Sequence, residues 1–155
     1  MIIRQMMTSD INDVQIMMRD LQNSHAEKAP EIFKMDVLRE PAYFEKLLSE
    51  KSRIIFVAEG SDGSPVGFVK GKIVDFPGTT TLHARKYGYV DGIFVKKEYR
   101  GQLVEYKLQK HLFNWFSMQG LKHVEANVWD FNERAREYYQ LFGYSYVKHG
   151  LQIDL

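Results

Sequence analysis

Apolar residues recur along the chain with two periods, one typical of strands and the other of helices. After the possible N-cap oxygens of residues 8–10, apolar side chains follow at spacings of three and four and predict a helix. The elements predicted in this way are strands at 2–6, 53–59, 66–76, 90–95, 123–129, 144–147 and 151–155, and helices that begin after Asp10, at Pro41, after Gly101 and after Asn132. The segment 24–36 is polar with a proline in its middle and is predicted as a loop or a broken helix, and the segment 77–86 is predicted as a loop.

The order β-α-α-β-β-β-α-β-α-β-β predicts an α+β protein. It contains no internal repeat, low-complexity tract or linker, so a single domain is expected over residues 1–155. The chain is organised around residues 89–120, where an apolar strand ends at Val95, a basic turn follows, and a long amphipathic helix ends near Gly120.

Composition narrows the classes of function. Apolar residues make up 45% of the chain, which is typical of a globular protein, and the net charge of +1 provides no overall attraction to nucleic acid or to a membrane surface. The absence of cysteine excludes disulfides, thiolate metal sites and a cysteine nucleophile. The first residues show no signal-peptide pattern and no apolar run is long enough to span a bilayer, so a cytoplasmic protein is expected.

Common phosphate-loop, hydrolase and metal motifs are missing. The chain has no G-x-x-x-x-G-K-[ST], no G-x-G-x-x-G after a strand and no G-x-S-x-G. Its five histidines lie far apart, without metal-ligand spacing: His25, His83, His111, His123 and His149. We therefore predict no metal site, and expect each histidine to be a surface or half-buried residue.

The junction between the central strand and its helix is a candidate anion site. A helix N-terminus presents backbone N–H groups without partners and the positive end of the helix dipole. Lys96, Lys97 and Arg100 surround this end with positive charge. The pattern therefore predicts a ligand that carries phosphate.

Two segments together carry a family resemblance. The central strand ends in a valine and is followed by Arg100-Gly101-Gln102-Leu103-Val104-Glu105, and residues 132–144 read N-E-R-A-R-E-Y-Y-Q-L-F-G-Y. These segments resemble the [RQ]-x-x-G-x-[GA] and N-x-x-A-x-x-[FLY]-Y-x-x-[LF]-G-[FY] motifs of the GNAT family of acetyl-CoA-dependent N-acetyltransferases. The resemblance implies the GNAT fold, with a mixed, mostly antiparallel central sheet flanked by helices. It also implies transfer of an acetyl group from acetyl-CoA to a primary amine, by direct attack in a ternary complex.

The first motif departs from the family pattern at two positions. Leu103 replaces a glycine that lets the backbone approach a pyrophosphate, and Glu105 places a negative charge where the family has glycine or alanine. An acidic residue in the first turn also stabilises a helix that has no anion at its N-terminus. Two alternatives therefore remain: a catalytically impaired GNAT-fold protein with a binding or regulatory role, and an acyltransferase that uses another acyl donor.

The resemblance assigns roles residue by residue. Tyr139 matches the tyrosine that protonates the leaving thiolate, with Tyr138 as its packing neighbour, and Asp91 lies where some members carry a carboxylate proposed as the base. Asp91 can equally be an outward-facing polar residue, and Asn132 a plain N-cap. The residues implied in binding acetyl-CoA are Ile93, Phe94, Val95, Arg100, Gly101, Gln102, Leu103, Val104, Glu105, Asn132 and Tyr139. Gly92 suggests a bulge in the central strand.

The acceptor site is expected between two loops, residues 25–36 and 77–87. Glu27, Glu31 and Asp36 could attract a cationic amine beside Phe33, or could form a solvated face. The acceptor itself is left open, as either a small-molecule amine or a protein amino group. The terminal strands are candidate edges for a homodimer, although the sequence does not fix the oligomeric state.

Overall fold

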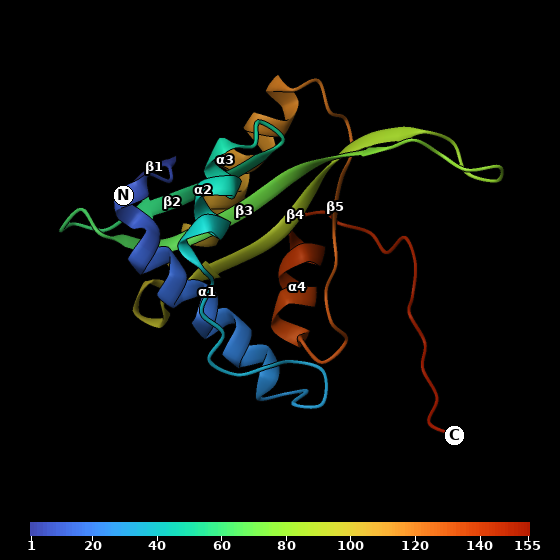
Figure 1. The fold of residues 1–155 in the computed structure, drawn as a ribbon, viewed down its shortest axis with the longest axis horizontal. Helices are drawn as coiled ribbons and strands as arrows, with labels where there is room; N and C mark the ends of the chain where they lie inside the picture. The colour runs from blue at the N-terminus through green and yellow to red at the C-terminus, as the bar shows by residue number, and fades with distance from the viewer.

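The computed structural model describes residues 1–155 and contains one five-stranded sheet with the strand order β1-β2-β3-β4-β5. The elements are β1 (Ile2–Gln5), α1 (Ile11–Ala26), α2 (Pro41–Ser49), β2 (Arg53–Glu59), β3 (Pro65–Phe76), β4 (Arg85–Val95), α3 (Val104–Met118), β5 (Val124–Ala126) and α4 (Glu133–Leu141). The first four strands pair antiparallel, whereas β5 runs parallel to β4. The strands β3 and β4 form a long hairpin that projects from the body of the molecule (Figure 1).

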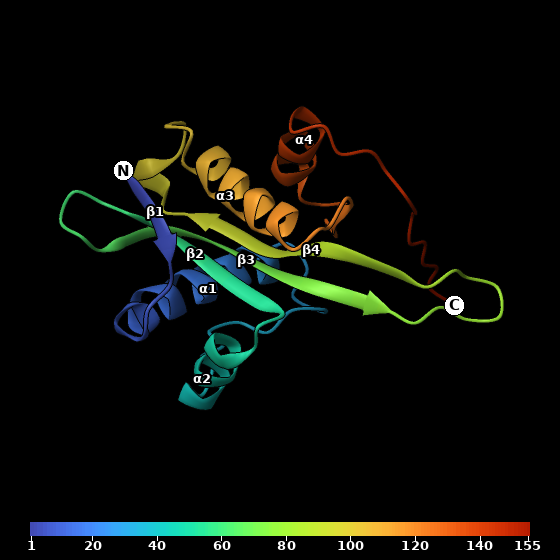
Figure 2. The same ribbon diagram turned by 90° about the horizontal axis from the view of Figure 1, so that it is seen from above.

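The helices cover the two faces of the sheet in pairs. Figure 2 shows α1 and α2 on one face, and α3 and α4 on the other. On the first face Val14, Met17 and Phe44 are fully buried against β2 and β3. On the second face Leu108 and Leu112 of α3 pack on strand valines. The two cores follow from the helical spacing of these apolar residues, and the predicted α+β sheet with flanking helices is confirmed.

The strands β4 and β5 separate after a short contact. Their register runs only from Gly88 opposite Val124 to Val90 opposite Ala126, so the remainder of β4, residues 91–95, has no partner on that edge. A register shift on the other edge, between Lys70 and Gly71 of β3, forms a bulge at this level of β4. The predicted bulge near Gly92 is therefore confirmed, and it marks the point where the sheet opens.

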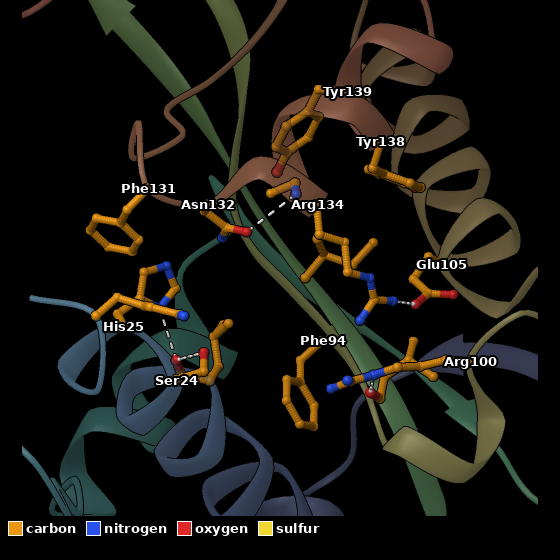
Figure 3. Close-up of a pocket in the computed structure, with 15 residues that line it drawn as sticks. Ser24, His25, Phe94, Arg100, Glu105, Phe131, Asn132, Arg134, Tyr138 and Tyr139 are labelled. Atoms are coloured by element: carbon orange, nitrogen blue, oxygen red, sulfur yellow. Dashed lines mark hydrogen bonds and ion pairs between the residues drawn. The ribbon is translucent and has the colours of Figure 1, made fainter.

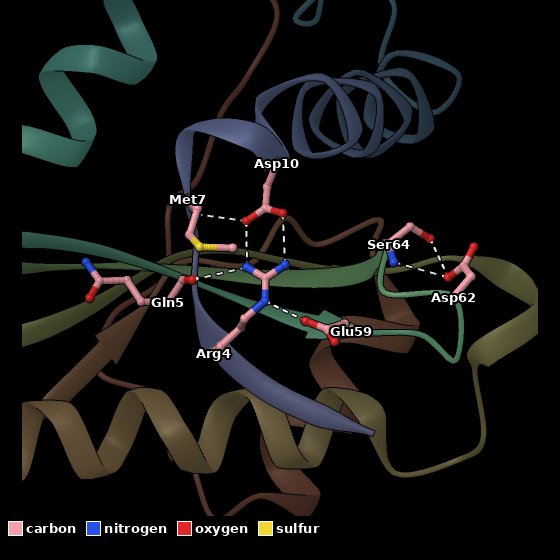
Figure 4. A network of polar contacts seen from close by, with 7 residues as sticks. All are labelled: Arg4, Gln5, Met7, Asp10, Glu59, Asp62 and Ser64. Carbon is pink, nitrogen blue, oxygen red and sulfur yellow. Dashed lines mark hydrogen bonds and ion pairs between the residues drawn. The ribbon is translucent and has the colours of Figure 1, made fainter.

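An ion-pair junction joins the start of α1 to the edge of the sheet. The guanidinium of Arg4 binds the carboxylate of Asp10 at 2.7 Å and that of Glu59 on β2 at 2.6 Å (Figure 4). Asp10 also accepts a hydrogen bond from the backbone N–H of Met7. The hydrogen bond from Arg4 keeps the pKa of the buried Asp10 carboxyl below its usual range. β1, β2 and α1 are thus held together by charge as well as by packing.

The predicted terminal strands were wrong. Residues 144–147 and 151–155 form no strand, and the side chains of Leu151, Ile153 and Leu155 are exposed. The predicted strand 123–129 is reduced to the three residues of β5. Alternating apolar residues alone do not make a strand, because the backbone N–H and C=O groups of a strand must pair with a neighbouring strand. The short β5 offers too few backbone groups for a further strand to pair with. None of the helices is long and apolar enough to cross a membrane.

Candidate functional site

A cavity of about 300 Å³ lies where β4 and β5 diverge. Side chains from α1, β4, α3 and α4 line it, so it extends between the two faces of the sheet. Its main lining residues are Leu21, Ser24, His25, Lys28, Ile93, Phe94, Val95, Arg100, Glu105, Phe131, Asn132, Arg134, Ala135, Tyr138 and Tyr139 (Figure 3). The cavity brings together seven of the residues predicted for acetyl-CoA binding: Ile93, Phe94, Val95, Arg100, Glu105, Asn132 and Tyr139.

One wall of the cavity is the unpaired edge of β4. Ile93, Phe94 and Val95 lie on this edge, where no neighbouring strand takes up their outward backbone groups. An extended ligand chain can therefore hydrogen-bond there as an added strand would. The carbonyl oxygen of Val95 accepts a hydrogen bond from Nε of Arg100 at 2.9 Å, and the Arg100 guanidinium lies 5.6 Å from the Phe94 ring centroid. Arg100 is thereby fixed beside the cavity with its terminal nitrogens free of any protein partner.

The loop before α3 keeps a glycine-like backbone although it lacks one of the usual glycines. Leu103 is the N-cap of α3 and adopts φ 60° and ψ 20°, the left-handed region, and Gly101 has φ 77°. A left-handed leucine costs about 1–2 kcal/mol, so the surrounding structure must enforce it. The Leu103 side chain is 67% exposed and does not line the cavity. No side chain caps the first N–H groups of α3, so they are left for another acceptor.

The charge of Glu105 is offset by a residue from the other helix. Arg134 of α4 donates a hydrogen bond to the Glu105 carboxylate at 2.8 Å across the cavity (Figure 3). Three cationic side chains line the cavity, Lys28, Arg100 and Arg134, against this one carboxylate. The cavity therefore has a net positive charge and can accommodate an anion, despite the acidic residue at the start of α3.

The N-terminus of α4 places Tyr139 in the same cavity. Asn132 caps the helix by accepting a hydrogen bond from the backbone N–H of Ala135 at 3.2 Å. Figure 3 shows the Tyr139 hydroxyl pointing from α4 toward Asn132, whereas Tyr138 points toward α3. Burial raises the pKa of Tyr139 to about 12. At neutral pH this phenol therefore holds its proton and can donate it.

Asp91 lies outside the lining of the cavity. It pairs with Lys70 of β3 at 3.0 Å, and the Lys70 ammonium also donates to the hydroxyl of Tyr43 on α2. Of the predicted cofactor residues, Gly101, Gln102, Leu103 and Val104 also lie outside it. Gln102 donates from its side chain to the carbonyl oxygen of Glu98, and Val104 is buried in the core. These four residues shape the loop rather than the cavity wall.

Several lining residues were not singled out by sequence patterns. Arg134 and Lys28 carry charge into the cavity, and His25 and Phe131 form part of an aromatic cluster with Phe33. Of the two predicted acceptor loops, residues 25–36 contribute His25 and Lys28 to the lining, and residues 77–87 contribute none. The charges of Glu27, Glu31 and Asp36, which suggested the first loop, do not line the cavity. Contacts between segments so far apart in sequence leave no local pattern.

The fold and the opened sheet define an α+β protein with a ligand cavity between diverging strands. A sequence model of the acetyltransferase (GNAT) family matches residues 18–144. The chain therefore belongs to the GNAT acetyltransferase family, as its two motifs predicted. A comparison with curated protein sequences finds no match.

Several solved structures share this fold. A mutant of the BH1408 protein from Bacillus halodurans has a TM-score of 0.94 at 20% identity, with 100% of this chain and 99% of that chain covered. A putative acetyltransferase from Agrobacterium tumefaciens has a TM-score of 0.76 at 20% identity and full coverage of both chains, 100% each. The aminoglycoside N-acetyltransferase AAC(6′)-Iy, in complex with CoA, has a TM-score of 0.75 at 18% identity, covering 99% of this chain and 98% of that one. At these identities the likeness concerns the fold.

Proposed function

We propose that the protein transfers an acetyl group from acetyl-CoA to a primary amine by direct attack in a ternary complex. The observation that carries the proposal is the cavity, which unites the free edge of β4, Glu105 in the uncapped first turn of α3 and the half-buried phenol of Tyr139. The relative AAC(6′)-Iy binds CoA, which supports CoA as the carrier. Without a cysteine, no thiol of the protein can carry the acetyl group between the two substrates.

The residues of the cavity fit the parts of acetyl-CoA. The free N–H groups of α3 and the unpaired guanidinium nitrogens of Arg100 would hold the phosphates. The β4 edge at Ile93–Val95 would bind the extended arm through backbone hydrogen bonds. Acetyl-CoA supplies an activated thioester. Tyr139 would donate its proton to the leaving sulfur, since its raised pKa keeps the phenol neutral at the pH of reaction.

The acceptor in this proposal is a primary amine on a small molecule or a protein. The only carboxylate lining the cavity, Glu105, is already paired with Arg134. A highly cationic acceptor would find no free carboxylate there. We therefore expect amines with a single positive charge to be better acceptors than polyamines.

Calorimetric titration with CoA and acetyl-CoA tests the first half of the proposal. Binding at a hundredfold excess over Kd would stabilise the folded protein by about 2.7 kcal/mol and raise its melting temperature. The competing assignment, a GNAT-fold protein with a regulatory role, predicts either that CoA binds without any transfer of the acetyl group or that CoA does not bind. An absence of binding at millimolar ligand would reject the transferase.

The exchange of Tyr139 for phenylalanine tests the second half. Tyr139→Phe should lower kcat about 100-fold, the usual scale for loss of a general acid, and leave CoA affinity unchanged. Tyr144→Phe is the matched control, because that phenol contacts the Tyr139 ring but does not line the cavity. Equal turnover in the two variants would remove Tyr139 from its role.

A further inference from the structure

His25 lies in the last turn of α1, across the cavity from Glu105 of α3 (Figure 3). Its imidazole lines the same space as Ile93 and Tyr139. The ring packs against Phe33 at 5.2 Å and Phe131 at 5.9 Å between centroids. Two separate segments, the loop after α1 and the connection before α4, therefore fix the orientation of the ring.

The tautomer of His25 follows from one hydrogen bond. Nδ1 lies 2.8 Å from the carbonyl oxygen of Leu21, one turn earlier in α1. A carbonyl oxygen can only accept, so the neutral ring carries its proton on Nδ1 and has a lone pair on Nε2. Nε2 has no protein partner, and Figure 3 shows it on the side of the ring nearer to Phe131 and Asn132. The backbone thus prepares Nε2 to accept a proton.

The carboxylates near the cavity are already engaged. Asp91 pairs with Lys70 and lies outside the lining, and Glu105 pairs with Arg134. The tyrosines Tyr138 and Tyr139 have pKa values raised by burial, so they retain their protons. Among the lining side chains, His25 is the one proton acceptor without a partner.

We infer that His25 is the general base that deprotonates the acceptor amine, a role that rests on the proposed acetyl transfer. Nε2 takes one proton from the ammonium group and passes it to solvent. The freed lone pair forms the C–N bond as the C–S bond breaks. Tyr139 gives its proton to the sulfur and recovers one from the nitrogen, so the amide, the thiol and one released proton balance the reaction. The acceptor therefore approaches along α1, with its body against the aromatic rings of His25 and Phe131.

Charged side chains lie on the elements packed around His25. They include Glu27 and Lys28 in the turn after α1, Asp130 in the connection before α4, where it pairs with Arg136, and Arg134 on α4, where it pairs with Glu105. Because an imidazole base acts only when neutral, turnover should fall as acid protonates it.

Two variants separate the base from its packing. His25→Phe keeps an aromatic ring against Phe33 and Phe131, and His25→Asn keeps an N–H donor for the carbonyl of Leu21; neither can accept the proton. With acetyl-CoA and 2-phenylethylamine, both should lose 100- to 1,000-fold in kcat, in the range for general-base catalysis. Their acidic limb in the pH–rate profile should disappear, whereas CoA affinity by calorimetry should stay within about twofold. His111→Asn is the matched control, because Nδ1 of that ring makes the same contact with the carbonyl oxygen of Lys107 but the residue does not line the cavity; it should retain kcat within about threefold.

The outcomes distinguish this inference from the proposed function. If wild-type protein binds CoA and acetylates the amine but either His25 variant keeps the wild-type rate and pH profile, His25 is not the base. If wild-type protein neither binds CoA nor transfers the acetyl group, the proposed function fails and the inference with it. Nitrogen NMR of the unliganded protein gives an independent reading. The neutral His25 ring should be protonated on Nδ1, and protonation on Nε2 would overturn the inference.

Discussion

The helices α3 and α4 both begin at the cavity, but their first turns are built differently. Asn132 caps α4 with its side chain, which satisfies the N–H of Ala135. The first turn of α3 has no side-chain cap and starts from a left-handed leucine, Leu103. The N-terminus of α4 therefore has fewer free N–H donors. The N-terminus of α3, which follows the strained Leu103, has no side-chain partner for its N–H donors. The difference assigns the anion to α3 and the positioning of Tyr139 to α4.

The largest effect should come from alkaline pH, because phenols in and beside α4 keep their protons to a higher pH in the folded protein than in the unfolded chain. Burial raises the pKa of Tyr139 to about 12 and also raises those of Tyr138 and Tyr144 above their usual range. In the unfolded chain these phenols ionise near pH 10. Above that pH the unfolded state binds fewer protons than the folded state, so the stability that these phenols contribute is constant below about pH 10 and falls as the pH rises toward 12.

Denaturant unfolding between pH 7 and 11.5 measures this decline. Tyr139→Phe should make the decline shallower, and Tyr146→Phe, at an exposed phenol, should not. A free energy of unfolding that stays flat to pH 11.5 in the wild-type protein would contradict burial of these hydroxyls.

The next effect tests the link between the two helix ends. Arg134→Ala leaves Glu105 as an unpaired negative charge beside the N-terminus of α3, and should weaken CoA binding about tenfold, or about 1.4 kcal/mol. Arg136→Ala is the matched control, since it breaks an ion pair of the same helix outside the cavity. Adding Glu105→Gln to the Arg134 variant should restore most of the affinity. Calorimetry that finds equal affinities for the two arginine variants would show that the pair does not serve the anion site.

Removal of the α4 cap should have a smaller effect, on stability. Asn132→Ala loses the side-chain acceptor for the N–H of Ala135 and should cost about 1 kcal/mol of unfolding free energy. For a protein of this size that lowers Tm by about 2–4 °C. Asn132→Asp keeps a cap and should remain near the wild-type Tm; if it falls as far as the alanine variant, the cap is not what stabilises α4.

The smallest effect concerns the left-handed residue of α3. Leu103→Gly removes the penalty for a β-carbon at φ 60°, partly offset by the greater freedom of glycine in the unfolded chain. We expect a net gain of about 0.5 kcal/mol and no change in CoA affinity, since the side chain faces solvent. Leu103→Ala keeps the β-carbon and should show no gain. A clear increase in CoA affinity for the glycine variant would mean that the leucine side chain hinders the ligand.

Sequence patterns predicted the elements of the fold where packing and propensity agree. The spacing of Val104, Leu108 and Leu112 predicts the buried face of α3, and the β-branched run in residues 53–59 predicts β2 with its observed bounds. The alternating pattern of residues 151–155 was misleading, because periodicity describes the side chains and not whether a partner strand exists. The opening of the sheet beyond Val90 likewise depends on β5, which is shorter than its pattern suggests.

The candidate site was only partly readable from the sequence. The motif positions identified Tyr139, Asn132 and the loop before α3, because those residues lie in contiguous segments. The pairing of Glu105 with Arg134 joins residues 29 positions apart on different helices, and no local pattern encodes it. The tautomer of His25 depends on a backbone carbonyl whose position is known only once α1 is built. Long-range geometry, rather than residue type, decides these features.

The arrangement of strands also has a consequence for the order of folding. Strands β2, β3 and β4 follow one another in the chain as neighbours in the sheet, so their pairing closes only short loops. β1 instead pairs with β2 across a loop that contains both α1 and α2, and the Arg4–Glu59 pair joins residues 55 positions apart. Because this closure costs more chain entropy, we expect β1 to dock after the β2–β4 unit has formed. The helix that carries His25 would then reach its final position last, and the cavity would be completed in the closing step of folding.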